Sequence, residues 1–162
     1  MDENGLVDSI GGHFYHGTLI HRSVIEQLGV TLEWLFFRGE EVEYGLRIMR
    51  AGYPILSVPA SVVYHPEMST VSLRAFGKTK FFEVMSPLKR YYSIRNSMWV
   101  RRVYYPDASL FLYAARRLGG TLLAELWLAP NKAWQERFAA CGAAMRAIMD
   151  GARMQPPENA NR

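Results

Sequence analysis

Residues 36–66 read FFRGEEVEYGLRIMRAGYPILSVPASVVYHP and carry the most informative pattern in the chain. Its first half predicts a helix over residues 40–51, because apolar residues recur there at i, i+4 and i+7, namely Val42, Leu46 and Met49. Gly39 permits a tight turn before this helix, and Gly52 is a suitable stop after it. The stretch therefore begins with a short amphipathic helix whose first turn is acidic.

Short elements surround that helix, which indicates an α/β arrangement. We expect a strand or extended loop over residues 13–20, a helix over 23–28 closed by Gly29, and strand-like runs over 54–58 and 61–64 around Pro59.

The rest of the chain is predicted to be mostly helical. Pro87 suits the first turn of one helix, Pro106-Asp107 opens a second that runs to about Leu128, and Asn131 can cap a third. The third helix carries an apolar stripe that we expect to pack in the core or against a partner, including a second copy: Trp134, Phe138, Cys141, Met145 and Met149.

Composition limits the class of protein. The chain has 162 residues, of which 49% are hydrophobic, which suffices for one domain with a core. A single cysteine cannot close an internal disulfide, and we expect a reducing compartment. No secretory signal is recognised after Met1, and the apolar run 108–128 is interrupted by charges, so no membrane-spanning helix is predicted.

Charge divides the chain into two parts. Residues 1–68 carry 4 Lys and Arg against 9 Asp and Glu, a net charge of −5, while residues 69–162 carry 15 against 6, a net charge of +9; together they give +4. An acidic part suits metals and proton transfer, and a basic part suits phosphates or an anionic surface.

Glu40 and Glu41 are the candidate catalytic residues. A carboxylate at a helix N-terminus is held ionised by backbone N–H groups and the helix dipole, as a general base requires. Adjacent residues on a helix point about 100° apart, so the two carboxylates take different roles. Complementation of the helix dipole is the alternative role for acidic residues in a first turn.

His65 is a further candidate site residue. It ends a strand-like run and can offer a nitrogen to a divalent metal, although a structural role is the alternative.

Several pieces in order resemble the catalytic region of family 2 glycosyltransferases, and most nearly the bacterial rhamnosyltransferases and galactofuranosyltransferases. The pieces are GTLIHRSVIEQLG (17–29), then residues 36–65 of the stretch quoted above, then YYSIRN (91–96). The resemblance covers most of residues 10–100.

The resemblance implies the C-terminal part of a glycosyltransferase-A type α/β fold and an inverting transfer from a nucleotide-sugar donor to a glycan or lipid-linked acceptor. It places the general base on Glu41, where the family often has Asp, and puts Glu40 near the acceptor or the base. It further implies a divalent metal, Mn²⁺ or Mg²⁺, with His65 as a ligand. Arg95 falls on a family position that suits a phosphate, with helix docking as the alternative. Because aromatic rings stack on sugar faces, Tyr15, His16 and Trp34 are candidate acceptor-binding residues, with ordinary packing as their alternative.

The sequence lacks the Asp-x-Asp motif with which that family holds metal and nucleotide sugar. We therefore expect that an N-terminal nucleotide-binding half is missing and that this chain alone is inactive. The expected organisation is an acceptor and base side over residues 1–86, a helical region over 87–153 and a disordered tail over 154–162.

A non-catalytic docking module is the alternative function. Four arginines, Arg101, Arg102, Arg116 and Arg117, lie near aromatic residues that include Trp99 and would suit an anionic membrane surface or a partner. The expected location is the cytoplasm, peripheral on the inner face of the plasma membrane. No nucleic-acid partner is expected, because no recognised binding signature accompanies the basic residues.

Overall fold

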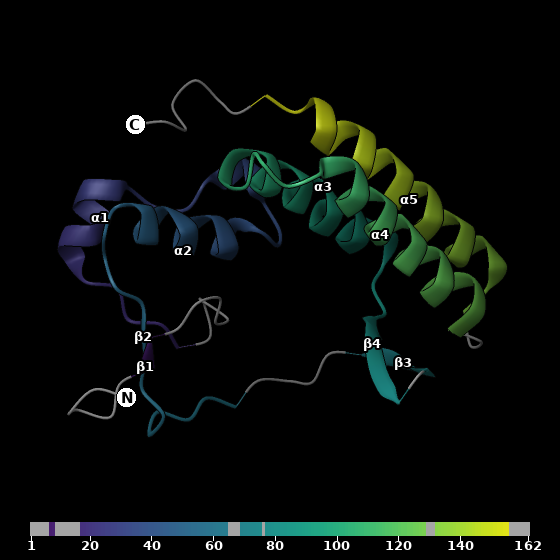
Figure 1. The fold of residues 1–162 in the computed structure, drawn as a ribbon, viewed down its shortest axis with the longest axis horizontal. Coiled ribbons are helices and arrows are strands. Elements are labelled where there is room, and N and C mark those ends of the chain that lie inside the picture. The colour runs from purple at the N-terminus through teal and green to yellow at the C-terminus, as the bar shows by residue number, and fades with distance from the viewer. Residues whose placement is uncertain (1–6, 9–16, 65–68, 76, 129–131, 156–162) are drawn as a thin grey trace. The chain divides into compact units, whose positions relative to one another are not determined.

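The structure is a computed structural model that describes residues 7–8, 17–64, 69–75, 77–128 and 132–155. It shows a mixed α/β chain whose described residues fall into two units, one up to residue 64 and one from residue 69 (Figure 1). The first unit contains β1 (Val7–Asp8), α1 (Arg22–Leu28), the 3₁₀ turn η1 (Glu33–Leu35), α2 (Glu40–Arg50) and β2 (Leu56–Ser57). The second contains β3 (Thr70–Ala75), β4 (Lys78–Glu83), α3 (Pro87–Tyr104), α4 (Leu110–Leu122), the π-helical segment η2 (Leu123–Leu128) and α5 (Trp134–Arg153). The predicted functional division at residues 86 and 87 stays a prediction.

The two helices of the first unit are confirmed where the sequence predicted them. Gly29 ends α1 with a φ of 74°, and its N–H donates to the Ile25 carbonyl. Gly39 precedes α2 in the left-handed region, with a φ of 99°, and Gly52 follows it at 85°. The helices pack through a small core of Val24, Tyr44 and Ile48, which orients α2 against α1.

Fewer residues of the first unit form strands than the sequence predicted. Within residues 54–58 only β2 pairs, antiparallel to β1, with Val7 opposite Ser57. Residues 61–64 form no strand, because the Ser61 N–H donates to the Val58 carbonyl in a turn around Pro59, which has no N–H of its own. Residues 17–20 are an extended loop, and residues 13–16 lie outside the described residues.

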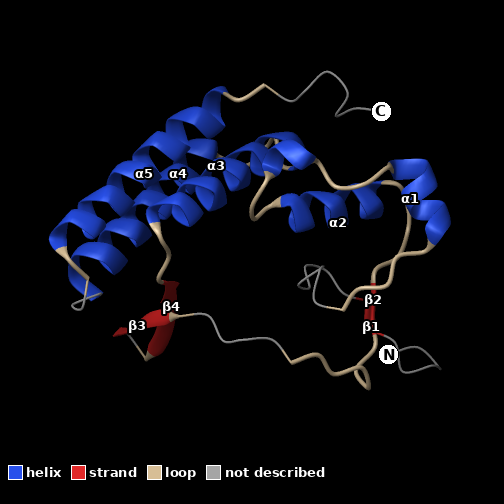
Figure 2. Cartoon of the chain, turned by 180° about the vertical axis from the view of Figure 1, so that it is seen from behind, coloured by secondary structure: helices blue, strands red, loops and turns tan. Residues whose placement is uncertain are grey.

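The second unit is largely helical, as predicted, and Figures 1 and 2 show α3, α4 and α5 side by side. Ser86 caps α3 by accepting from the Lys89 N–H, and Pro87 occupies the first turn. α4 begins later than predicted, at Leu110, because Ser109 provides the side-chain cap. Its helical continuation η2 ends at Leu128, the predicted end.

A β-hairpin that the sequence did not predict precedes these helices. β3 and β4 pair antiparallel along their full lengths, from Thr70 opposite Glu83 to Ala75 opposite Lys78. Gly77 supports the tight connection with a φ of 73°. β3 also contacts η2, so the hairpin belongs with the helices of the second unit.

The face that α5 buries is not the predicted one. Trp134, Phe138, Met145 and Met149 are each at least half exposed, and only Cys141 of the predicted stripe is buried. The buried face instead carries small residues that let α5 approach α3 closely, namely Ala140, Ala144, Ala147 and Gly151. The prediction that this stripe packs in the core is therefore wrong. Its packing against a partner stays a prediction. Ala133 is the N-cap of α5, and Asn131 lies outside the described residues.

A buried carboxylate joins the hairpin, α3 and η2. Glu125 in η2 is 1% exposed and makes ion pairs with Arg90 and Lys132. Arg90 also donates to the Glu83 carbonyl, and Lys132 to the Met85 carbonyl. Two cations therefore compensate the one buried carboxylate, as burial of a charge requires.

Within the described residues, no helix is both long enough and apolar enough to cross a bilayer.

We predict that Gly151→Ala destabilises the fold, whereas Gly142→Ala does not. A Cβ at Gly151 would lie 2.7 Å from the Arg95 carbonyl oxygen and 2.7 Å from the Met98 Cβ, so α3 and α5 must separate. Such overpacking costs about 1–3 kcal/mol. Gly142 is also in α5 but has nothing within 4 Å of such a Cβ, and alanine there favours the helix by about 1 kcal/mol. Urea unfolding measures both; equal effects would contradict the close approach at Gly151.

Candidate functional site

The candidate site is the N-terminus of α2, and the residues just before this helix have an unusual backbone conformation. Phe36 and Arg38 have φ values of 59° and 57°, and Gly39 follows at 99°. Side chains other than glycine adopt this region at a cost of order 1–3 kcal/mol each, and such residues cluster at functional sites. This strain could not be predicted from the sequence, because Gly39 alone of the three is a residue suited to a positive φ.

The three acidic residues of the first turn have different environments. Glu43 is only 2% exposed, and both its carboxylate oxygens accept from Arg47: Nε donates to Oε1 at 3.0 Å and Nη2 to Oε2 at 2.9 Å. Glu40 and Glu41 are half-buried at the helix start. Glu43 is therefore committed to structure, which leaves the two residues that the sequence singled out for chemistry.

Arg47 and Tyr44 tie α2 to the end of α1. Arg47 donates to the Leu28 carbonyl at 2.6 Å and to the Val30 carbonyl at 2.9 Å, while the Tyr44 hydroxyl donates to the Gly29 carbonyl at 2.9 Å. The Arg47 guanidinium also lies over the Tyr44 ring, 4.9 Å from its centroid. Three successive carbonyls at the end of α1 are thus held by α2.

Glu40 lines an open pocket of about 450 Å³. Its other lining residues are mainly apolar: Ile20, Ile25, Val30, Thr31 and Tyr44. The Glu40 Oε2 is buried and has no hydrogen-bond partner among the described residues. Burial raises the pKa of Glu40 above its ordinary value of 4.5; a backbone hydrogen bond at Glu40 opposes this rise, the neighbouring Glu41 adds to it, and Arg38 opposes it more weakly. A carboxyl so placed accepts a proton more readily than an exposed one.

Glu41 follows Glu40 in the first turn of α2, beside the backbone N–H groups that begin the helix. Among the described residues, no hydrogen bond or ion pair engages the Glu41 side chain. The helix start therefore presents one desolvated carboxyl and one uncommitted carboxylate side by side.

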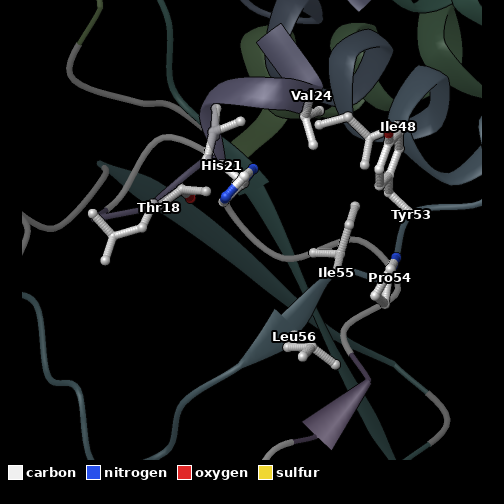
Figure 3. Close-up of a pocket in the computed structure, with 10 residues that line it drawn as sticks. Thr18, His21, Val24, Ile48, Tyr53, Pro54, Ile55 and Leu56 are labelled. Carbon is white, nitrogen blue, oxygen red and sulfur yellow. The ribbon is translucent and has the colours of Figure 1, made fainter. Parts of the chain in front are cut away.

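A second pocket, of about 330 Å³, lies between α1, α2 and β2 (Figure 3). Figure 3 shows Val24 of α1, Ile48 of α2 and Ile55 turned towards the same space. Its polar groups include the His21 ring, whose Nδ1 accepts from the Ser23 N–H and thereby caps α1. The two pockets share Ile20, so the first unit offers apolar surface next to the acidic helix start.

The remaining predicted acceptor and metal residues are only partly described. Trp34 lies half-buried in η1, just before the strained segment. Tyr15, His16 and His65 lie outside the described residues. Among those that the structure does describe, no group of three or more His, Cys, Asp or Glu could hold a metal ion. The divalent metal and its ligand His65 stay predictions.

Arg95 belongs to the second unit, on α3. Its Nε donates to the Asn96 Oδ1 at 2.9 Å, and its guanidinium lies over the rings of Tyr92 and Tyr91, 4.6 and 5.8 Å from their centroids. These contacts support a structural role on α3, and the phosphate role stays a prediction.

Three of the four arginines proposed for docking make contacts inside the second unit. Arg102 donates to the Ala152 carbonyl at 2.6 Å, Arg117 donates to the Ser93 hydroxyl at 3.1 Å, and Arg101 lies over the Tyr113 ring. Arg116 is the exposed member of the four, and Trp99 is buried. The predicted basic cluster therefore does not gather its side chains on one free surface.

Comparison of the chain with protein-family models, with curated proteins and with solved structures finds no match.

We predict that the Glu40 carboxyl titrates above 4.5 and that its titration affects folding. Because its pKa is higher in the folded state than in the unfolded state, its stabilising effect is full below 4.5 and is lost as the pH rises through the folded pKa. ¹³C NMR titration of the glutamate carboxyl signals measures the first effect, and unfolding against pH measures the second.

Glu40→Gln should remove this pH-dependent step, and Glu136→Gln, an exposed first-turn residue of α5, should leave it unchanged. A Glu40 signal that titrates at or below 4.5 would contradict the desolvation of this side chain.

Proposed function

We propose that this chain is the acceptor side of an inverting glycosyltransferase with a glycosyltransferase-A type fold. The observation that carries the proposal is that the three glutamates in the first turn of α2 differ in their surroundings: Glu43 is bound by Arg47, Glu40 lines a pocket, and Glu41 follows Glu40 at the helix start. The order of sequence pieces that resembles family 2 glycosyltransferases supports the same function.

In this mechanism Glu41 is the general base. Its carboxylate takes the proton from an acceptor hydroxyl, and the resulting oxygen attacks the anomeric carbon from the face opposite the leaving nucleotide, which inverts the configuration. The helix N-terminus favours the ionised carboxylate before the transfer. The fixed position of α2 on α1 supplies the orientation that such a reaction needs.

Glu40 then has a supporting role. Its buried Oε2 can accept a hydrogen bond from a second acceptor hydroxyl, and the apolar lining around it suits the ring face of a sugar or the start of a lipid chain. A glycan or lipid-linked acceptor fits this combination of a carboxyl and apolar walls. The nucleotide-sugar donor and the divalent metal are proposals that rest on the resemblance, and no step above is routed through the metal.

Glu41→Gln should abolish transfer while leaving the fold intact. The assay adds the purified chain to an extract of source cells whose own copy of the gene has been deleted, together with radiolabelled nucleotide sugars, and counts label in the glycan fraction. Loss of a general base lowers the rate by about 10²-fold to 10⁴-fold. Glu136→Gln, the matched first-turn variant on α5, should keep the wild-type rate.

Two results would overturn the proposal. One is a Glu41→Gln chain that restores transfer as well as the wild type does. The other is a wild-type chain that adds no transfer to the deleted extract. Thermal unfolding of each variant shows whether a lost rate reflects lost folding.

A further inference from the structure

The second unit exposes many large apolar side chains on its last helices. They lie on α4, η2 and α5 and form what we term the apolar face: Phe111, Leu112, Leu122, Trp127, Trp134, Phe138, Met145 and Met149. Trp127 and Phe111 are 81% and 84% exposed. Neither the proposed catalytic site nor the helical core uses these residues.

On α4 these side chains point away from α3. Tyr113 and Arg117 mark the side of α4 that faces α3, because they contact Arg101 and Ser93 of that helix. With about 100° between successive residues, Phe111 and Leu122 fall on the opposite side of α4. Their exposure agrees with this placement.

On α5 the same argument gives the same side. Gly151 and Ala147 face α3, and the stripe from Trp134 to Met149 lies more than a quarter-turn away from them around the helix. The Trp134 and Phe138 rings stack at 6.0 Å, so this end of the stripe is a continuous apolar surface. Because α4 and α5 pack against each other, their two stripes form one face directed away from α3.

The size of the apolar face exceeds ordinary scatter of surface residues. An aromatic side chain buries about 150–250 Å² when covered, so rings that are more than half exposed leave on the order of 100 Å² each. Eight large side chains therefore present several hundred Å², an extent that marks an interaction site.

The charges around the apolar face are mainly positive. Within the described residues of α4 and α5, Arg116, Arg146 and Arg153 are exposed, and Glu136 is the only exposed acidic residue. Asp150 is half-buried and accepts from the Tyr91 hydroxyl at 2.7 Å. A partner of matching chemistry combines an apolar interior with negative charge at its edge.

We propose that the apolar face is a peripheral docking site for an anionic lipid bilayer. α4 and α5 would lie in the plane of the membrane interface with Trp127 and Trp134 at headgroup level, where indole rings are favoured. The three exposed arginines would meet the lipid phosphates. A second copy of the chain is disfavoured as the occupant, because it would bring six exposed arginines to one interface with two exposed glutamates.

Flotation of the full chain with vesicles tests this proposal. We expect binding to vesicles that mix phosphatidylcholine with phosphatidylglycerol, weaker binding to phosphatidylcholine alone, and a decrease with added salt. The variant W134S/F138S should lose most of this binding. The matched control is Leu88→Ser, an exposed apolar residue at the start of α3, which should bind as the wild type does.

The arginines are tested by R116Q/R146Q/R153Q. Each arginine near an anionic surface contributes about fivefold in binding, so the triple variant should bind about 10²-fold more weakly. R74Q/K78Q/K80Q removes the same charge from the exposed hairpin and should retain much more of the binding.

Three results would overturn the proposal: no binding of the wild type to either vesicle, an equal loss in the two charge variants, or a dimer in sedimentation velocity that W134S/F138S converts to monomer. The last result would assign the apolar face to a second copy. Far-UV circular dichroism checks that every variant keeps its helices.

Discussion

The buried ion pair between Glu43 and Arg47 is the constraint on which the first unit depends. Removing a carboxylate from water is costly, and Arg47 compensates it while also holding the carbonyls of Leu28 and Val30. One guanidinium thus fixes the rotation of α2 about its axis and its contact with α1. With that rotation fixed, Glu40 faces its pocket, and Glu41 is presented beside it without a structural partner. The proposed proton transfer is a consequence of this division among three glutamates.

The second unit also contains a buried carboxylate, but two cations compensate it instead of one. Glu125 is buried in a π-helical segment and is compensated by Arg90 and Lys132, which also hold carbonyls before α3. π-Helical segments widen a helix locally and commonly mark positions under special demand. Both units therefore use a buried carboxylate to join elements that are short or distant in sequence. Each unit is stabilised internally, and the proposed base and the apolar face belong to different units.

The sequence predicted local features well and non-local ones poorly. Helices closed by glycine or opened by Pro87 were predicted because their signals lie within a few residues. The β3–β4 hairpin was missed, although Gly77 supplied a turn signal. The stripe from Trp134 was predicted to pack in the core or against a partner, because periodicity shows that a helix has an apolar face but not that its small-residue face is the one buried. Likewise, the acidic first turn identified Glu40 and Glu41, but only the contact with Arg47 showed that Glu43 is structural.

A double-mutant cycle on Glu43 and Arg47 measures how strongly the two side chains are coupled in the folded chain. Urea unfolding of the full chain is compared for the wild type, Glu43→Gln, Arg47→Met and the double variant. If the pair is the buried constraint, Arg47→Met alone costs about 3–5 kcal/mol because it leaves a buried carboxylate without a cation. The double variant should recover part of that loss, with a coupling energy above about 2 kcal/mol. A coupling energy of about 0.5 kcal/mol or less, the value for an exposed pair on one helix, would contradict the account.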